Sequence, residues 1–331
     1  MSIHTVLRWG FSAALSGLVP GSLAQHQAQP MARPPAAALS SLQSVQIGED
    51  SGANTIHASA NEVNLIFTVS NRQGRFMKDL KQSDFALLDD HKAPAQVYSF
   101  SQETNMPLRV GILIDTSSSI RQRFQFEQQA TTEFLLQLLR PNIDQAFIMS
   151  FDATADLKQD WTSNLDQLKT GINAARPGGG TALYDALYTA CRDKLLDSAR
   201  GPEPVRKAVI LVSDGDDNQS RALLVDSIEM CQRAETIVYT ISTNTSPWLG
   251  RGDDVLKKIS EATGGTAFYP QKLKDISSGF RHIADELHSQ YALQYKPADF
   301  RADGSFRDIY LSCRDGRYTV RAKRGYFTSR D

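Results

Sequence analysis

The sequence contains few cysteines and no excess of charge of either sign. Three cysteines, Cys191, Cys231 and Cys313, occur in 331 residues, and an odd number spread so thinly argues against a disulfide framework. We expect most of them to be buried as small apolar side chains. Lys and Arg total 36 against 37 Asp and Glu, so no net field attracts the chain to nucleic acid or to an anionic membrane surface. A partner must be recognised locally.

Two short motifs of common enzymes are also missing from the chain. There is no G-x-S-x-G elbow, which would present a nucleophilic serine, and no P-loop, which would hold phosphates. Their absence excludes two frequent routes to hydrolysis and phosphoryl transfer. We therefore expect the chain not to be an enzyme.

The first residues have the features of a secretory signal peptide, which we assign to residues 1–24. His4 and Arg8 precede an apolar patch, and the segment ends in the small-x-small step Ser22–Ala24. Because Pro20 interrupts the patch, it falls short of the roughly 20 apolar residues that a membrane span needs. We expect an exported protein, periplasmic or secreted, with no membrane span once the leader is cleaved.

Composition divides the rest of the chain into four parts. Residues 25–44 are rich in Pro, Ala and Gln and lack periodicity, which predicts a disordered linker. Residues 45–104 and 291–331 contain short β-rich runs separated by turn residues. Residues 105–290 alternate apolar runs with helical patterns, which predicts one larger domain.

The larger domain has the pattern of an α/β fold with a doubly wound, mostly parallel sheet. Its strands are predicted as near-continuous apolar runs, typical of strands covered on both faces, at 108–115, 145–151, 207–213 and 236–242. Apolar residues at three- and four-residue intervals predict helices, at 120–138, 181–199, 221–235, 254–263 and 273–290. We expect the β-rich segments before and after this domain to form one small flanking β module, because short strands need a partner sheet.

Three loops rich in oxygen follow the predicted strands. The first strand ends in Asp115–Ser119, a three-glycine turn leads into Thr181, and a later strand ends at Asp214. Each has a structural explanation: Ser119 with Gln122 fits a capping box, Thr181 fits an N-cap, and Asp214 with the next glycine fits a turn. Sheets of this kind bind ligands at the carboxyl ends of their strands. One hard divalent cation would explain all three loops together.

The residue types suit Mg²⁺, which takes about six oxygens and usually keeps several waters. Asp115, Ser117 and Ser119 alternate along an extended chain, so their side chains can point to one side. The glycines before Thr181 allow a close approach of the second loop. No histidine lies in these loops to act as a general base.

These three motifs resemble the metal-ion-dependent adhesion site of von Willebrand factor type A domains. The resemblance covers residues 108–290, with no departure at the metal positions, and the whole chain is similar to bacterial exported proteins described as related to that family. It implies that Ser117, Ser119 and Thr181 coordinate Mg²⁺ or Mn²⁺, while Asp115 and Asp214 act directly or through waters. It also implies a protein partner that presents an acidic residue. A purely structural metal in a scaffold is the alternative, and a metal-dependent hydrolase is a weaker one.

Two further features of the sequence each have a structural and a functional interpretation. Arg251–Asp253 spell RGD, an integrin-binding tripeptide, but the same residues fit a turn that enters the next helix. Asp185 lies in the first turn after Thr181, where a carboxylate favours the helix dipole. A role for Asp185 in orienting a metal ligand is the second interpretation.

Overall fold

A computed structural model of the chain describes residues 62–102, 106–118, 124–196, 198, 205–244 and 248–328. The predicted signal peptide and linker lie outside these ranges. Within them no helix combines the length and the apolar character needed to cross a membrane.

A six-stranded, mostly parallel sheet forms the larger part of the fold. The sequence predicts such a sheet and four of its strands. Its strands are β4 (Leu108–Asp115), β5 (Gln145–Phe151), β6 (Ala155–Thr162), β7 (Arg206–Ser213), β8 (Ile237–Ser242) and β9 (Ala267–Phe268). Their order is β6-β5-β4-β7-β8-β9. All neighbours are parallel except β5 and β6, which are antiparallel.

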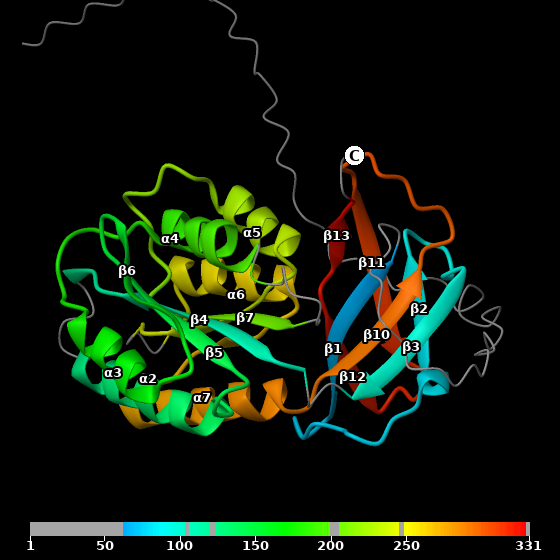
Figure 1. Ribbon diagram of the computed structural model, residues 1–331, viewed down its shortest axis with the longest axis horizontal. Coiled ribbons are helices and arrows are strands. Elements are labelled where there is room, and N and C mark those ends of the chain that lie inside the picture. The colour runs from blue at the N-terminus through cyan, green and yellow to red at the C-terminus, as the bar shows by residue number, and fades with distance from the viewer. Residues whose placement is uncertain are drawn as a thin grey trace, which may run out of the picture. The chain divides into compact units, whose positions relative to one another are not determined.

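Helices cover both faces of this sheet (Figure 1). One face carries α2 (Phe124–Leu138), α3 (Leu165–Ala174) and α7 (Leu273–Leu287), and the other carries α4 (Leu183–Thr189), α5 (Leu224–Arg233) and α6 (Arg251–Thr263). Alternate residues of β4 pack on opposite faces of the sheet. Ile112 and Ile114 belong to the apolar core shared with α2, α3 and α7, and Leu113 belongs to the core shared with α4, α5 and α6. This two-sided burial explains why the strands read as unbroken apolar runs.

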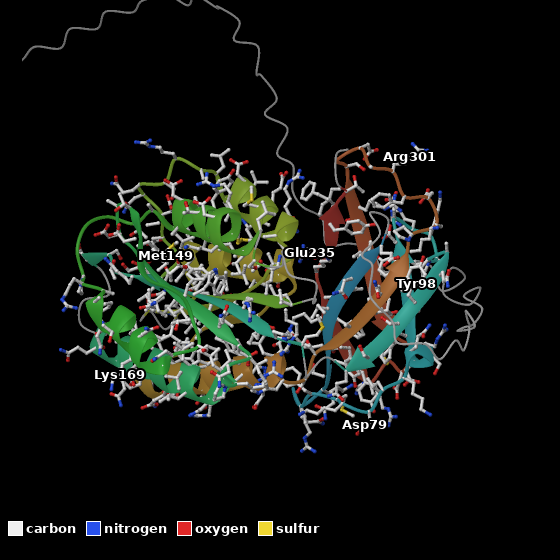
Figure 2. The ribbon with its side chains drawn as sticks, viewed as in Figure 1. Asp79, Tyr98, Met149, Lys169, Glu235 and Arg301 are labelled. Carbon is white, nitrogen blue, oxygen red and sulfur yellow. A yellow bond between two sulfur atoms is a disulfide. The ribbon has the colours of Figure 1, made fainter. Side chains whose placement is uncertain are left out.

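Figure 2 shows the same division at the level of side chains. Met149 of β5 points into the interior and is 3% exposed. Lys169 of α3 points away from the sheet toward solvent. Helix α3 thus has an apolar and a solvated face.

The N- and C-terminal segments pair with each other, as predicted from their short strands. Strand β1 (Val63–Asn71) is antiparallel to both β10 (Tyr291–Lys296) and β12 (Tyr318–Ala322), and β10 also pairs with β3 (Gln96–Gln102). A second sheet contains β2 (Phe85–Asp89), preceded by the short 3₁₀ helix η1 (Gln82–Asp84), together with β11 (Phe306–Cys313) and β13 (Gly325–Phe327). Residues from both sheets share one apolar core. We call these two sheets the β module.

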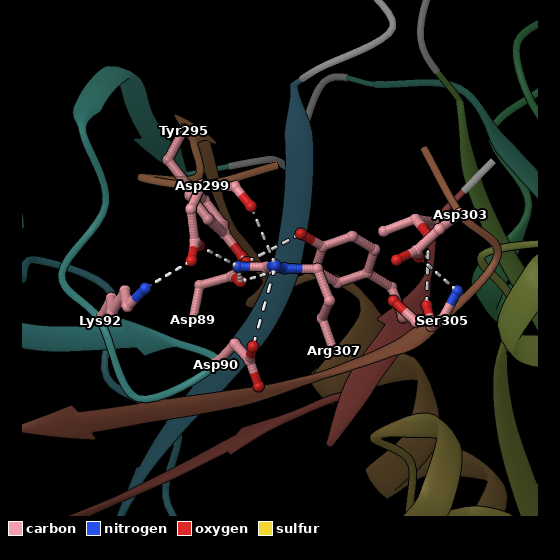
Figure 3. Close-up of polar contacts among 10 residues, drawn as sticks. Asp89, Asp90, Lys92, Tyr295, Asp299, Asp303, Ser305 and Arg307 are labelled. Atoms are coloured by element: carbon pink, nitrogen blue, oxygen red, sulfur yellow. Dashed lines mark hydrogen bonds and ion pairs between the residues drawn. The ribbon is translucent and has the colours of Figure 1, made fainter. Parts of the chain in front are cut away.

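A buried ionic cluster joins strands of both sheets in the β module (Figure 3). Asp89 at the end of β2 is 1% exposed and accepts a hydrogen bond from Nε of Arg307 at 2.7 Å. The hydroxyls of Tyr295 and Tyr326 donate to the other carboxylate oxygen of Asp89, at 2.7 and 2.9 Å. Arg307 also pairs with Asp299 at 3.0 Å. The negative charge of Asp89 is therefore compensated within the fold.

Cys191 and Cys231 are buried in an apolar core, as expected, whereas Cys313 is partly exposed. The sequence did not show that the two buried cysteines would be bonded to each other. Cys191 and Cys231 form a disulfide, whereas Cys313 is not disulfide-bonded. Cys191 belongs to η3 (Ala190–Leu195), a π-helical segment that continues α4, and Cys231 belongs to α5. Because α4 and α5 pack together, cysteines separated by 40 residues have Cα atoms 5.0 Å apart, within the range that a disulfide spans.

Candidate metal centre

The first loop begins with Asp115, a carboxylate that is fully buried at the end of β4. It accepts hydrogen bonds from the hydroxyl of Ser213, at 2.6 Å, and from the backbone N–H of Ser117, at 2.8 Å, and the Ser117 side chain also bonds to it. Burial, with a smaller contribution from the charge of Asp214, outweighs these hydrogen bonds and raises the pKa of Asp115 to about 6. Proximity of a second carboxylate is unfavourable unless a cation lies between or beside them.

The second loop is fixed against the first by backbone contacts of its glycines. Gly178 N–H donates to the carbonyl of Thr116 at 2.6 Å, and the hydroxyl of Ser118 donates to the carbonyl of Gly179 at 3.0 Å. Gly179 has φ +66°, in the left-handed region that favours glycine. A Cβ there would also lie 3.1 Å from the carboxylate of Asp152. The sequence needs glycine at this position for both reasons.

The third loop is bonded to the second around Thr181. The backbone N–H of Thr181 donates to Oδ1 of Asn218 at 3.0 Å, and its carbonyl accepts from the N–H groups of Asn218 and Gln219 at 2.9 and 3.0 Å. Helix α4 has Ala182 at its N-cap, without a side-chain cap hydrogen bond. Thr181 is therefore not the N-cap of this helix.

The turn after Asp214 packs closely on the start of α6. A Cβ at Gly215, which has φ +82°, would lie 2.1 Å from the carbonyl oxygen of Gly252, and a Cβ at Gly252 would lie 2.1 Å from that of Asp214. Asp253 is 2% exposed and accepts from Ser242 Oγ at 2.6 Å and Gly250 N–H at 2.8 Å. The RGD tripeptide thus forms the first turn of α6, with its carboxylate used inside the fold.

Four of the five predicted ligands lie at loops that hydrogen bonds hold together. Asp115, Ser117 and Thr181 are 0%, 3% and 4% exposed, and Asp214 is partly exposed. Ser119 lies outside the described residues. The placement of a metal on these five residues remains a prediction.

The donor chemistry fits a hard divalent cation. Carboxylate and hydroxyl oxygens are the ligands that Mg²⁺ prefers, and nitrogen or sulfur ligands, which favour zinc, are not among the five residues. Across the described part of the chain, no group of three or more His, Cys, Asp or Glu residues is arranged to hold a metal ion. Such a group is not required here, because hydroxyls make up three of the five expected ligands.

Acidic residues continue beyond the predicted ligands. Burial, together with the charges of Asp214 and Asp253, raises the pKa of Asp216. The structure also assigns a role to Asp185, whose carboxylate accepts from the backbone N–H groups of Arg221 and Ala222, at 2.8 Å for Ala222. Asp185 holds the end of the third loop against α4.

Sequence reasoning missed Ser213, Asn218 and Asp152. Ser213 donates to Asp115 and accepts from Gly215 N–H at 3.0 Å, so it links the first and third loops. Its only sequence signal is its position directly before Asp214 at the end of a strand. Asn218 and Asp152 follow β7 and β5 at the same edge of the sheet, but polar residues after a strand are common in ordinary turns.

Comparison with known proteins gives a family match over part of the chain. The model of the von Willebrand factor type A domain matches residues 110–216. A UPF0353 protein of Mycolicibacterium gilvum is 26% identical over 205 residues, which cover 54% of this chain and 60% of that protein. The corresponding protein of Mycolicibacterium paratuberculosis is 25% identical over 220 residues, covering 56% of this chain and 63% of the relative. The chain therefore spans less than two thirds of these relatives.

Solved structures show similar chains at low identity. One is a structure described as von Willebrand factor type A from Catenulispora acidiphila. It is 14% identical to this chain with a TM-score of 0.49, and the aligned region covers 82% of this chain and 74% of that one. Proximal thread matrix protein 1 from the mussel byssus, with a zinc-occupied metal-ion-dependent adhesion site, is 16% identical with a TM-score of 0.49, and covers 60% of this chain and 49% of its own. The family match, on the sheet and loops described above, shows that this chain contains a von Willebrand factor type A domain.

Proposed function

We propose that this chain is an exported binding protein that recognises a protein partner through a divalent metal held by Asp115, Ser117, Ser119, Thr181 and Asp214. The observation that supports this most strongly is the fully buried Asp115 carboxylate, which accepts hydrogen bonds from neutral groups of Ser213 and Ser117. A buried carboxylate beside a second one is costly without a positive charge. A bound Mg²⁺ or Mn²⁺ would supply that charge.

The proposed ligands are of two kinds, neutral hydroxyls and charged carboxylates. Ser117, Ser119 and Thr181 would contribute neutral hydroxyl oxygens, and Asp115 and Asp214 would bind directly or through waters. Two serines and a threonine leave much of the positive charge of the ion uncompensated. A carboxylate from a partner is favoured by that residual field, and more strongly when docking excludes water.

Several features support export and binding in place of catalysis. The leader predicts secretion, and the Cys191–Cys231 disulfide suits an oxidising compartment. Domains of this family are generally interaction modules. The loops contain no histidine that could act as a general base. The scaffold alternative, in which the ion only holds the loops, differs in having no coordination position open to a partner.

Calorimetric titration of the metal-stripped mature chain with MgCl₂ and MnCl₂ tests the site. We expect one saturable site in the wild type and loss of binding in Asp214→Ala and in the double variant Ser117→Ala with Ser119→Ala. Ser118→Ala is the matched control, since its hydroxyl bonds to Gly179 and is not a proposed ligand. Absence of saturable binding in the wild type contradicts the site.

A pull-down from envelope extract, with Mg²⁺ and again with chelator, tests the partner. We expect a partner that is retained only with the metal and is lost with Asp214→Ala. A partner bound equally in chelator and by this variant would contradict the adhesion mechanism. Metal binding together with such metal-independent capture would favour the scaffold alternative.

A further inference from the structure

Four of the most exposed large apolar side chains lie at the starts of α5 and α6, at the metal edge of the sheet. Trp248 and Leu249, before α6, are 80% and 65% exposed, and Leu223 and Val225, at the start of α5, are 64% and 61% exposed. Tryptophan is highly buried on average in folded proteins. A tryptophan and a leucine exposed side by side in a loop therefore need an explanation.

The loop that carries Trp248 is anchored beside Asp214. Thr243 N–H donates to the carbonyl of Ser213 at 3.0 Å, and Gly252 packs against the carbonyl of Asp214 as described above. Trp248 is four residues from Gly252, so their Cα atoms are at most about 15 Å apart. The hydrogen bond from Gly250 N–H to Asp253 turns the chain between them. A bound peptide of about five extended residues covers this distance.

The charges around the loop restrict what can bind there. Asp216 and Asp254 are exposed near the same edge. This acidic surrounding repels a run of carboxylates. It tolerates one carboxylate, and only where the ion compensates it.

We infer that Trp248 and Leu249 form an apolar subsite beside the metal, for a partner segment with a single carboxylate followed or preceded by a large apolar side chain. The inference rests on the proposed metal-dependent function and adds the composition of the recognised segment. The carboxylate would complete the coordination of the ion, while the neighbouring apolar side chain would pack on the indole. Exposed apolar surface at a site rimmed by polar residues is typical of an interaction surface.

A random heptapeptide phage library, selected on the metal-loaded mature chain and eluted with chelator, is the probe. We expect clones with one Asp or Glu and a Trp, Phe, Leu or Ile within about four positions, the reach of the loop estimated above. The double variant Trp248→Ser with Leu249→Ser should keep the acidic preference and lose the apolar one. A synthetic peptide of a selected clone should bind this variant about tenfold more weakly, or about 1.4 kcal/mol.

Leu136→Ser is the matched control, because Leu136 is 57% exposed near the far end of α2, and it should leave peptide affinity unchanged. Clones rich in acidic residues without an apolar preference overturn the subsite alone. The same apolar preference in the double variant also overturns it. Absence of both metal binding and chelator-eluted clones overturns the proposed function as well. If the double variant only converts a dimer to a monomer in light scattering, the surface binds a second copy and the inference is wrong.

Discussion

Two buried aspartates, one in the β module and one in the larger domain, differ in how their negative charge is compensated. In the β module, Asp89 receives hydrogen bonds from the Arg307 guanidinium and from two tyrosine hydroxyls (Figure 3). In the von Willebrand factor type A domain, Asp115 receives them from neutral groups of Ser213 and Ser117 and lies near Asp214. Both side chains are 1% exposed or less.

This difference separates a structural carboxylate from a candidate functional one. A buried carboxylate needs a partner of opposite charge or must give up its own charge. In the β module that partner is Arg307, a residue of the chain itself. The type A domain gives Asp115 neutral donors and a neighbouring carboxylate, Asp214. This arrangement is expected where the compensating cation comes from solution. Four predictions test this contrast.

The largest effect is expected from Arg307→Met, which removes the internal cation. Asp89 would then be buried without compensation, and we expect the free energy of unfolding to fall by about 3–5 kcal/mol. Urea unfolding followed by circular dichroism measures it. Arg317→Met is the control, because Arg317 is 74% exposed and its pair with Asp315 lies at the surface. A loss below about 1 kcal/mol would mean that Asp89 is compensated in another way.

The next effect concerns the covalent link of the type A domain. Replacing both Cys191 and Cys231 by Ser should lower the free energy of unfolding by about 2–4 kcal/mol, the usual range for a disulfide. Cys313→Ser should change it little, since Cys313 is not disulfide-bonded. Reduction of the wild type with dithiothreitol should reproduce the double variant. Equal stability of reduced and oxidised chains would contradict the disulfide as a stabilising link.

Metal should stabilise the chain through Asp115 and not through Asp89. At 100 times the dissociation constant, Mg²⁺ should add about 2.7 kcal/mol to the free energy of unfolding. Chemical denaturation with Mg²⁺ and with chelator measures this gain. We expect the gain to persist in Arg307→Met and to vanish in Asp214→Ala. A gain that survives Asp214→Ala would place the ion elsewhere.

The smallest effect lies at the opposite end of the same sheet. Asp144 is desolvated, which raises its pKa, but hydrogen bonds from Arg140 and from Leu108 N–H outweigh burial and lower its pKa overall. Asp144→Asn should cost on the order of 1.5 kcal/mol at pH 7, the lower end for a hydrogen bond to a charged group.

The pH dependence of Asp144→Asn follows from the sign of that shift. Because the folded-state pKa is lowered, the unfolded chain binds more protons in acid, and the contribution of Asp144 is present above the unfolded pKa of about 3.9 and lost below it. The stability difference between wild type and Asp144→Asn should therefore shrink as the pH falls from 6 toward 3. Urea unfolding at stepped pH measures it. A difference that grows in acid would reverse the sign of the shift.

The predicted sheet agrees closely with the structure because its strands carry a strong local signal. The expected run at 108–115 coincides with β4 (Leu108–Asp115), and that at 145–151 with β5 (Gln145–Phe151). Continuous β-branched runs between polar loops leave few alternatives. Strand β6 (Ala155–Thr162) and helix α3 (Leu165–Ala174) were not predicted. The exposed edge strand β6 lacks a buried run, and the ten residues of α3 give a short pattern.

The chain order and residue types of the three loops were evident from the sequence alone, because each motif is local and follows an apolar run. The sequence also separated the β-rich ends from the larger domain. It could not identify Ser213 as a donor to Asp115, the Cys191–Cys231 pair, or the compensation of Asp89 by Arg307. Each of these joins residues that are between 40 and 218 positions apart. Only the packing of sheets and helices brings such residues within bonding distance, and local periodicity carries no information about that distance.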